Sequence, residues 1–442
     1  MSRKFNLIFL ALIPVLAMPI FSQDFGFSDE DTDDMDFDAI PFAVTVGGEV
    51  SASLLGYVDD FSEGADHTRL GNVFSGKLNF YAGNSFGDAI INLKLSPDKE
   101  KQDFPIDFDE AYLCAYFGNL EIEGGLRKLV WGKADSLGPL DVINPLDNRE
   151  ITDISNTMDI KIARPLIHAT ARIGQFSKLE GVFVPVFEST KFAWDGRWAP
   201  SQIAELLSLI PPNNYPDPSP PSTINYAQAG LRFTSSVGSS DIGAQYYYGR
   251  LPKPAFKLNF DPSDPSSLSI DVRYNSYHQI GLDYAQVIAG YNIRAECAAN
   301  ITDDLDGDDG AVYNPHLLWS LGFDRDIVWG VNFNLQCNET IRLLYNKIGE
   351  NPLLDMEADA DTTFTQITAI LSKKFLRDEL ELRAAALWDI EDRDFFIVPA
   401  LIWTRDAVKA EVSGGIFGGR DEGQFGQYHK NSFVKIELSY TF

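Results

Sequence analysis

The sequence predicts an all-β fold, a closed antiparallel transmembrane β-barrel, and three observations support this fold class. The final segment, 433–442, alternates strictly between apolar and polar residues, and segments of about 9 to 13 residues with the same two-residue period recur from Phe42 onward. Short and long joins alternate between these segments, and the chain ends on an aromatic residue, Phe442. This combination is typical of outer-membrane barrels.

The last strand shows the predicted sidedness most clearly. Val434, Ile436, Leu438 and Tyr440 occupy one face, and Phe433, Lys435, Glu437, Ser439 and Thr441 occupy the other. We expect the first face to meet lipid and the second to face the lumen, with Phe433 at a rim because it breaks the polar pattern. Since an open edge would leave unpaired backbone groups in lipid, the first strand, near Phe42, should pair with 433–442.

The alternation defines eighteen strands, and sixteen is the alternative because the segments 270–286 and 393–404 alternate poorly. Short joins are expected near 84–87, 118–119, 174–177, 236–240, 287–290, 326–329, 376–379 and 404–407. Longer connections are expected at 58–68, 96–106, 132–165, 188–223, 250–270, 301–315, 347–362 and 418–431, with 389–394 a short exception. The long connections should lie on the outer side of the membrane and the short ones on the periplasmic side.

The region before the barrel, 42–442, is predicted to have two parts. Residues 1–22 resemble a signal peptide, because a short cationic stretch precedes an apolar run that prolines interrupt, and a small residue, Ser22, follows. Residues 23–41 are acidic without any basic residue, which predicts a disordered leader. Beyond residue 23 no apolar run approaches the roughly 18 residues that a membrane helix needs.

The amino-acid composition excludes some classes of binding partner and of covalent cross-link. A net charge of -28 argues against nucleic acid, which is bound by basic surfaces. The three cysteines, Cys114, Cys297 and Cys337, are too few and too far apart for a disulfide framework. Cys297 and Cys337 alternate with apolar neighbours, so we expect both to be small outward-facing hydrophobic residues.

The predicted inner face carries charges of both signs. Arg294 with Glu296, and Glu381 with Arg383, lie two residues apart on one face, where they can pair with charges on neighbouring strands. The other predicted lumen charges are Lys77, Lys94, Glu123, Arg127, Arg172, Arg232, Asp283 and Arg342. Because neither sign dominates, a pore lined by these side chains should select weakly among ions.

The segment 132–165 is polar and broken by Gly and Pro, yet it lies between two well-patterned strands, and Asn144-Pro145 is a turn signal. We expect it to fold inward and constrict the lumen, where its carboxylates would meet Arg127, Arg172 and Arg232, since a buried charge needs a partner. The alternative is an external loop. The predicted constriction residues are Asp135, Asp141, Asn144, Asp147 and Arg164.

Two motifs in this segment carry a resemblance to a known family. Trp131-Gly132 with Asp135 forms WG-x-x-D, and Asp141 to Asp147 forms DVINP-x-D. The chain resembles, over 42–442, a family of Gram-negative outer-membrane barrels that is regarded as porin-like and classed as a domain of unknown function. The segment 196–200, GRWAP, is similar to spirochaete members. The resemblance implies a porin or exporter, and the terminal Phe442 resembles the signal read by the barrel assembly machinery.

Three further features suggest more specific hypotheses. In 188–223, Ile203, Leu206, Leu207 and Ile210 have helical spacing between prolines, which predicts a short helix in an outer loop. The acidic segment 303–310 resembles a calcium loop, but Asp309 replaces the turn glycine and no Glu completes it. Ser276 and His278 have the spacing of a barrel phospholipase, although an aromatic girdle beside Tyr274 explains them more simply.

The sequence as a whole predicts an outer-membrane porin-like channel that passes small polar solutes. It predicts outer-membrane lipid as the surroundings, no cofactor, no metal site and no catalytic residue. The alternatives are a lipid-hydrolysing barrel enzyme and a surface adhesin or antigen.

Overall fold

A computed structural model describes residues 43–59, 70–96, 105–208, 210–211, 214–215, 217–261, 263–351 and 354–442. The predicted signal peptide, 1–22, and the predicted acidic leader, 23–41, lie outside these described residues. Within the described part of the chain, no helix has the length and apolar character needed to cross a membrane.

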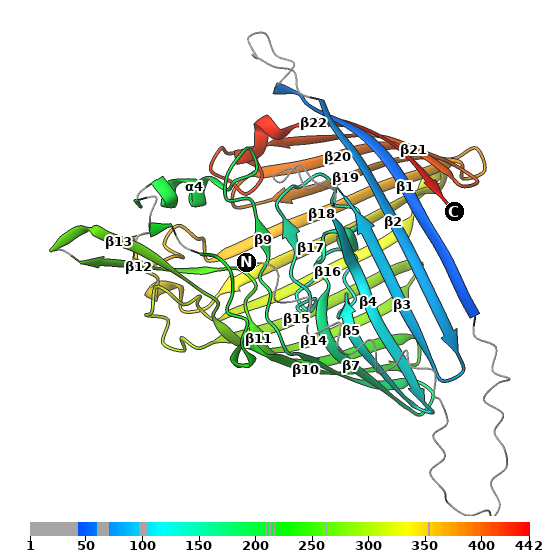
Figure 1. Ribbon diagram of the computed structural model, residues 1–442, viewed down its shortest axis with the longest axis horizontal. Helices are drawn as coiled ribbons and strands as arrows, with labels where there is room; N and C mark the ends of the chain where they lie inside the picture. The colour runs from blue at the N-terminus through cyan, green and yellow to red at the C-terminus, as the bar shows by residue number, and fades with distance from the viewer. Residues whose placement is uncertain are drawn as a thin grey trace, which may run out of the picture. The chain divides into compact units, whose positions relative to one another are not determined.

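The described chain forms a closed antiparallel barrel of eighteen strands, as predicted, and the alternative of sixteen is wrong (Figure 1). The strands are β1 (Ala43–Tyr57), β2 (Leu70–Asn84), β3 (Gly87–Leu95), β4 (Ile106–Phe117), β5 (Leu120–Arg127), β7 (Arg164–Ile173), β8 (Ser177–Val184), β10 (Gln228–Val237), β11 (Ser240–Arg250), β14 (Ser276–Ile288), β15 (Tyr291–Thr302), β16 (His316–Asp326), β17 (Val331–Arg342), β18 (Thr363–Phe375), β19 (Leu380–Asp389), β20 (Asp394–Arg405), β21 (Val408–Gly418) and β22 (Phe433–Thr441). Each barrel strand pairs with the next one along the chain. The predicted short joins connect every second pair, such as β2 with β3 and β4 with β5, and longer connections link the pairs between them.

Closure joins the two ends of the barrel. β1 pairs antiparallel with β22, and Ala52 lies opposite Leu438 while Ser51 lies opposite Ser439. The predicted pairing of the first and last strands is therefore confirmed. Every barrel strand in the described part of the chain has two neighbours, so the sheet closes on itself without an open edge strand.

The sidedness of the last strand is also confirmed. Val434, Ile436, Leu438 and Tyr440 are each 51 to 56% exposed. On the opposite face Ser439 is buried and Phe433 is buried among aromatic residues at one end of the strand. Because the apolar face is the exposed one, this strand has the polarity of a barrel that is surrounded by lipid.

The two poorly alternating segments have different explanations. Segment 270–286 spans the end of one strand and the start of another, because β13 (Asp264–Arg273) pairs with β12 (Ala255–Asp261) in a separate hairpin that projects beyond the barrel strands (Figure 1). Segment 393–404 is β20, whose inward side chains Phe396, Val398 and Ile402 are apolar and buried. Its alternation is weak because both of its faces are apolar.

The connections contain the remaining short elements. These are a parallel pair, β6 (Asp147–Asn148) with β9 (Lys191–Phe192), the helices α3 (Thr157–Ile160) and α4 (Ser201–Ser208), and the 3-10 turns η4 (Ile224–Tyr226), η5 (Val328–Gly330), η6 (Tyr345–Lys347) and η7 (Gly426–Asn431). Helix α4 is the helix predicted in 188–223. The N–H groups of Ile203 and Ala204 bond to the carbonyl of Pro200, and Pro211 follows the helix.

Two apolar clusters are buried in this barrel. The insert cluster consists of Leu129, Trp131, Ile143, Leu166, Val182, Val184, Tyr247, Leu251 and Tyr277. The loop cluster consists of Leu55, Trp198, Phe396, Val398, Phe417, Phe425, Tyr428 and Phe433. Each combines strand residues with residues from long connections, so the connections are packed onto the strands rather than extended into solvent.

The register of β22 generates a prediction about stability. Replacing Leu438 by Arg should lower the free energy of unfolding in lipid vesicles by about 2–4 kcal/mol, because the charge would enter the apolar band of the membrane. The matched control is Thr441→Arg, since Thr441 is exposed on the opposite face of the same strand. Denaturant titration of both variants provides the measurement. Equal losses for the two variants would contradict the assigned sidedness.

Candidate pore constriction

Strand β5 ends at Arg127 and β7 begins at Arg164, so the inserted segment spans 128–163, slightly displaced from the predicted 132–165. We call 128–163 the insert. Asn144 fastens its two ends together. Its Oδ1 accepts the N–H of Leu129 at 2.7 Å, and its Nδ2 donates to the carbonyls of Arg127 at 3.0 Å and Ile162 at 2.8 Å. Asn144, predicted as a constriction residue, therefore shapes the insert instead of facing a solute.

The main polar contact between the insert and the barrel wall is made by Glu296 on β15. Its carboxylate accepts backbone N–H groups from Lys133, from Ala134 at 2.7 Å and from Leu140 at 3.2 Å. Gly132 has φ 103°, and a Cβ at this position would collide with the same carboxylate. The glycine of the WG-x-x-D motif thus permits both the turn and the close approach to Glu296.

Three buried glutamines on the same part of the wall hold this stretch. Gln245 on β11 and Gln279 on β14 each donate at 3.0 Å, to the carbonyls of Leu140 and Pro139. Gln336 on β17 accepts the N–H of Asp135 at 3.0 Å. These contacts place residues 133–140 against the inner wall formed by β11, β14, β15 and β17. The two-residue period places Gln336 on the polar face, but the glutamines were not among the predicted pore-lining residues, since nothing in the sequence distinguishes them from other polar inward side chains.

The ion pairs differ from the prediction. Asp135 of the insert pairs with Arg294, which also pairs with Asp324 at 2.7 Å. The expectation that insert carboxylates meet Arg127, Arg172 and Arg232 is wrong, because each of these is paired with a carboxylate of the wall. Their partners are Glu123 for Arg127, Glu121 for Arg172 at 3.8 Å, and Asp283 for Arg232 at 2.6 Å. Glu123 lies on the same strand as Arg127, Glu121 on the strand next to that of Arg172, and Asp283 two strands away from Arg232, so wall carboxylates neutralise all three arginines.

Two predicted constriction residues stabilise the interior of the insert. Asp141 pairs with Lys161 at 2.5 Å, and both side chains are buried. Burial raises the pKa of Asp141, and Lys161 opposes this rise. Arg164 donates to the carbonyls of Ile143 at 2.7 Å and Val186 at 3.0 Å. Neither side chain is exposed in the lumen, so the structure assigns both a supporting role.

The remaining predicted residues lie where wall and connections meet. Asp147 pairs with Arg149 at 2.7 Å within the insert, and Lys77 on β2 pairs with Asp159 of α3 at 3.2 Å. Arg342 pairs with Glu357 of the connection between β17 and β18 at 3.1 Å. Arg383 pairs with Glu411 at 3.9 Å. Lys94 and Glu381 are half-buried on the inner face. Arg294 and Glu296 do not pair with each other, since each binds the insert or a neighbouring strand.

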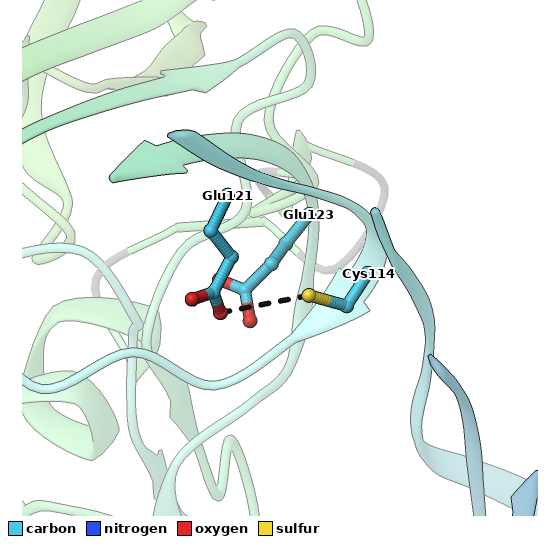
Figure 2. A group of neighbouring side chains, drawn as sticks. All are labelled: Cys114, Glu121 and Glu123. Atoms are coloured by element: carbon cyan, nitrogen blue, oxygen red, sulfur yellow. Dashed lines mark hydrogen bonds between the residues drawn. The ribbon is translucent and has the colours of Figure 1, made fainter. Parts of the chain in front are cut away.

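One group of thiol and carboxylate side chains lies on β4 and β5. Figure 2 shows Cys114 pointing toward Glu121, with Sγ 3.5 Å from its Oε1 and Glu123 alongside. In the described part of the chain, the ligand atoms of these three residues lie within 4.8 Å of one another. Glu123, however, also contacts Arg127 and lies 2.6 Å from Nδ1 of His168. The two carboxylates of this group therefore have arginine partners, Arg127 for Glu123 and Arg172 for Glu121, and do not require a metal.

Two neighbouring cavities, of about 370 and 390 Å³, lie between the insert and the wall and share Arg172 and Lys178. These two side chains are 71% and 48% exposed. Arg172 and Lys178 are paired with Glu121 and Glu180 respectively, so the cavity surface is polar and close to charge balance. Such a surface is accessible to water and to polar solutes.

Two motifs, the Ser276/His278 spacing and the acidic segment 303–310, had suggested a phospholipase site and a calcium loop. In the structure their side chains have other hydrogen-bond partners. Ser276 donates to Asp303, whereas Nδ1 of His278 lies 2.7 Å from the hydroxyl of Tyr246. His278 is exposed on the outward face, beside Tyr246 and Tyr248. In the acidic segment 303–310, Asp304 accepts N–H groups from Gly307 and Asp309. Local backbone donors thus already satisfy this carboxylate.

Comparisons with known proteins support the fold. No family model matches the chain, and no curated protein matches it. Among solved structures, the chain is similar to Pseudomonas aeruginosa OccK2 (OpdF) in complex with glucuronate, with 9% identity and a TM-score of 0.52 over 90% of this chain and 98% of that chain. It is also similar to P. aeruginosa OccK5 (OpdH), with 11% identity and a TM-score of 0.49 over 90% and 98%. The likeness to OccK2 shows that the chain has a porin-like barrel fold.

Proposed function

We propose that this protein is an outer-membrane channel through which small polar solutes pass, with the insert as its constriction. The observation that carries the proposal is an asymmetry of the inner wall. The insert is hydrogen-bonded to β11, β14, β15 and β17, whereas inward charges on β21 and β22 remain accessible, such as Lys409, 41% exposed, and Lys435, 30% exposed. An accessible row of inward charges implies a water-filled passage beside the insert.

The charge arrangement favours polar solutes without strong selection by sign. Lys409 pairs with Glu411 at 2.8 Å, and Lys435 pairs with Glu437 at 2.7 Å. Because these lumen charges are mostly paired, neither sign dominates the passage. A solute with hydrogen-bonding groups can exchange contacts with them, whereas an apolar solute cannot.

The biological setting forms part of the same proposal. The exposed apolar band favours outer-membrane lipid as the surroundings. The predicted signal peptide and the terminal aromatic strand favour export followed by insertion by the barrel assembly machinery. The motif resemblance to the porin-like family of unknown function points to the same place, and no cofactor or nucleic acid is part of the proposal. Channel activity is preferred to lipid hydrolysis because Ser276 and His278 have separate partners.

Deletion of residues 138–158 tests the constriction. Removing most of the insert should raise the single-channel conductance in planar bilayers several-fold and weaken solute discrimination, because the segment that narrows the lumen would be gone. The matched control is deletion of 257–271 from the β12–β13 hairpin, which projects beyond the barrel strands and should leave conductance unchanged. An unchanged conductance after deletion of 138–158, with normal insertion, would contradict the proposal.

A milder variant tests the contact that holds the insert. Glu296→Gln removes the negative charge and turns an amide N–H₂ toward one of the three backbone donors, so the insert should be held less firmly. A hydrogen bond to a charged group contributes about 1.5–3 kcal/mol. We expect larger conductance fluctuations in single-channel recordings.

Glu437→Gln is the matched control for this variant, since Glu437 is another inward glutamate and pairs with Lys435 on its own strand. It should leave the conductance fluctuations at the wild-type level. If the two variants are equally noisy, Glu296 has no special role in holding the insert.

A further inference from the structure

Two buried aspartates face each other at the rim of the barrel, where a short turn joins β19 to β20. Asp389 ends β19 and Asp394 begins β20, and the two residues are direct partners in the antiparallel register. Both residues are 0% exposed. Directly opposed residues on one face of an antiparallel pair have Cβ atoms about 4.5–5.5 Å apart. We call these two residues the aspartate pair.

The hydrogen bonds of the two carboxyl groups are unequal. Oδ2 of Asp394 accepts the N–H groups of Phe425 at 2.5 Å and Gly426 at 3.0 Å, whereas Oδ1 of Asp389 accepts the N–H of Asp392 at 3.3 Å. The other oxygen of each group, Oδ2 of Asp389 and Oδ1 of Asp394, is buried and accepts no hydrogen bond from the protein. Hydrogen bonds donated to a carboxylate favour its charged form. Asp394 is therefore better placed than Asp389 to keep a negative charge.

The charged groups closest to the aspartate pair are acidic. Within the turn, Asp392 and Glu391 interact electrostatically with Asp389, and Asp392 also interacts with Asp394. Glu391 accepts the hydroxyl groups of Thr363 and Thr365 on β18. Arg393, in the same turn, is exposed, and among the described residues no Lys, Arg or His forms an ion pair with either aspartate. Nothing in the turn neutralises the pair.

The elements packed around the pair supply no cation either. The register partner of Asp389 on β18 is the neutral Gln366. The charged side chains of the connection 419–432 are exposed, and they include two ion pairs, Arg420 with Glu422 at 3.9 Å and His429 with Asp421 at 3.8 Å. The oxygens of Asp389, Asp392 and Asp394 do not all lie within 4.8 Å of one another, so these three residues do not form a metal site. A bound proton is the remaining way to remove one of the two buried charges.

The connection 419–432 lies directly against the pair. At Gly419 an added Cβ would collide with Asp394, and at Gly423 it would meet Asp392 and the carboxylate of Asp394. Two positions without side chains thus allow the backbone of the connection to reach the carboxyl group that binds it.

The same connection is in contact with the insert. Its residues Phe425 and Tyr428 belong to the loop cluster, and Ile151 and Ile154 of the insert pack against that cluster. A change at the aspartate pair therefore acts on the connection first, and through the loop cluster on the insert.

We propose that Asp389 and Asp394 hold one proton between them, and that this proton makes the attachment of the connection 419–432 sensitive to pH. With the proton bound, the pair carries one negative charge, and Asp394 uses it to accept the two N–H groups of the connection. When the proton is lost, two opposed carboxylates repel each other in a buried place, and the turn separates from the connection.

The direction of the pH effect follows from proton linkage. In the unfolded chain both aspartates lose their protons near the ordinary pKa of about 4. The folded pair keeps one proton to a higher pH, so in this interval the folded state binds more protons than the unfolded state. The stability that this proton contributes is complete below about pH 4 and falls as the pH rises, until the pair has lost the proton. Acid should therefore hold the connection and alkali should release it.

Melting temperatures of the full-length refolded protein in detergent, measured from about pH 5 to about pH 9, test this proposal. Asp389→Asn has a neutral partner for Asp394 at every pH. Its melting temperature minus that of the wild type should therefore increase by several degrees as the pH rises, while groups common to both proteins cancel in the difference. Asp308→Asn is the matched control, since Asp308 is exposed in the segment 303–310, and its difference from the wild type should not change with pH.

Asp394→Asn gives a second measurement. This variant also removes one charge, but it weakens the acceptor of the two N–H groups from the connection, because hydrogen bonds to a charged acceptor are stronger. It should melt below Asp389→Asn at every pH. Equal melting temperatures for the two variants would contradict the assignment of the charge to Asp394.

A difference between Asp389→Asn and the wild type that stays constant over this pH range would overturn the proposal. Hydrogen exchange of the wild-type protein adds a measurement that needs no variant. The backbone N–H groups of Phe425 and Gly426 should exchange increasingly faster than those of β22 as the pH rises, and a constant ratio of the two rates would also count against the proposal.

The effect on conductance rests on the proposed channel function. Release of the connection should loosen the insert, so the wild type should show larger conductance fluctuations at alkaline pH in planar bilayers, and Asp389→Asn should not. The two failures are distinguishable. A protein without conductance whose melting difference rises with pH would contradict the channel alone, and a conducting protein with a constant melting difference would contradict the proton alone.

Discussion

The interior of this barrel depends on the bonding of one carboxylate, Glu296. A connection that turns into the lumen brings backbone N–H groups that have no strand partner, and leaving them unbonded in a buried place is costly. Glu296 accepts three such groups, from Lys133, Ala134 and Leu140. The buried amides of Gln245, Gln279 and Gln336 add further bonds to the same stretch. Together these side chains replace the β-ladder that the insert lacks.

This arrangement makes the barrel interior uneven. On one wall the insert cluster is packed under Trp131, and near one end of β22 the loop cluster is packed around Trp198 and Phe417. Between these apolar regions, paired charges such as Arg383 with Glu411 remain in contact with water. The wall thus serves two purposes, because part of it anchors connections and part of it borders the proposed passage.

The period of two residues predicted most of the fold. It located the lipid-facing side of β22, the short joins and the closure with β1, because the membrane imposes a strict choice between apolar and polar faces. The inward direction of the insert was also anticipated. The partners within the lumen were not, since the choice of Arg294 over Arg127 for Asp135 depends on strand register, which single-residue patterns do not specify. The contacts of Lys161 and of the three glutamines with the insert were not predicted, because they depend on the folded path of the insert.

Strand β20 shows that the inward face of a barrel strand can be apolar where a connection packs against it. Phe396, Val398 and Ile402 face inward, while Leu401 and Trp403 face outward, so its own sequence does not distinguish the two sides. A one-residue slip would exchange two apolar faces, so hydrophobicity between Phe395 and Trp403 does not by itself select the register. The pairing of β20 must therefore be specified by its neighbours, above all by the alternating strand β19, and the orientation of this part of the wall is fixed during assembly only when partner strands are already in register.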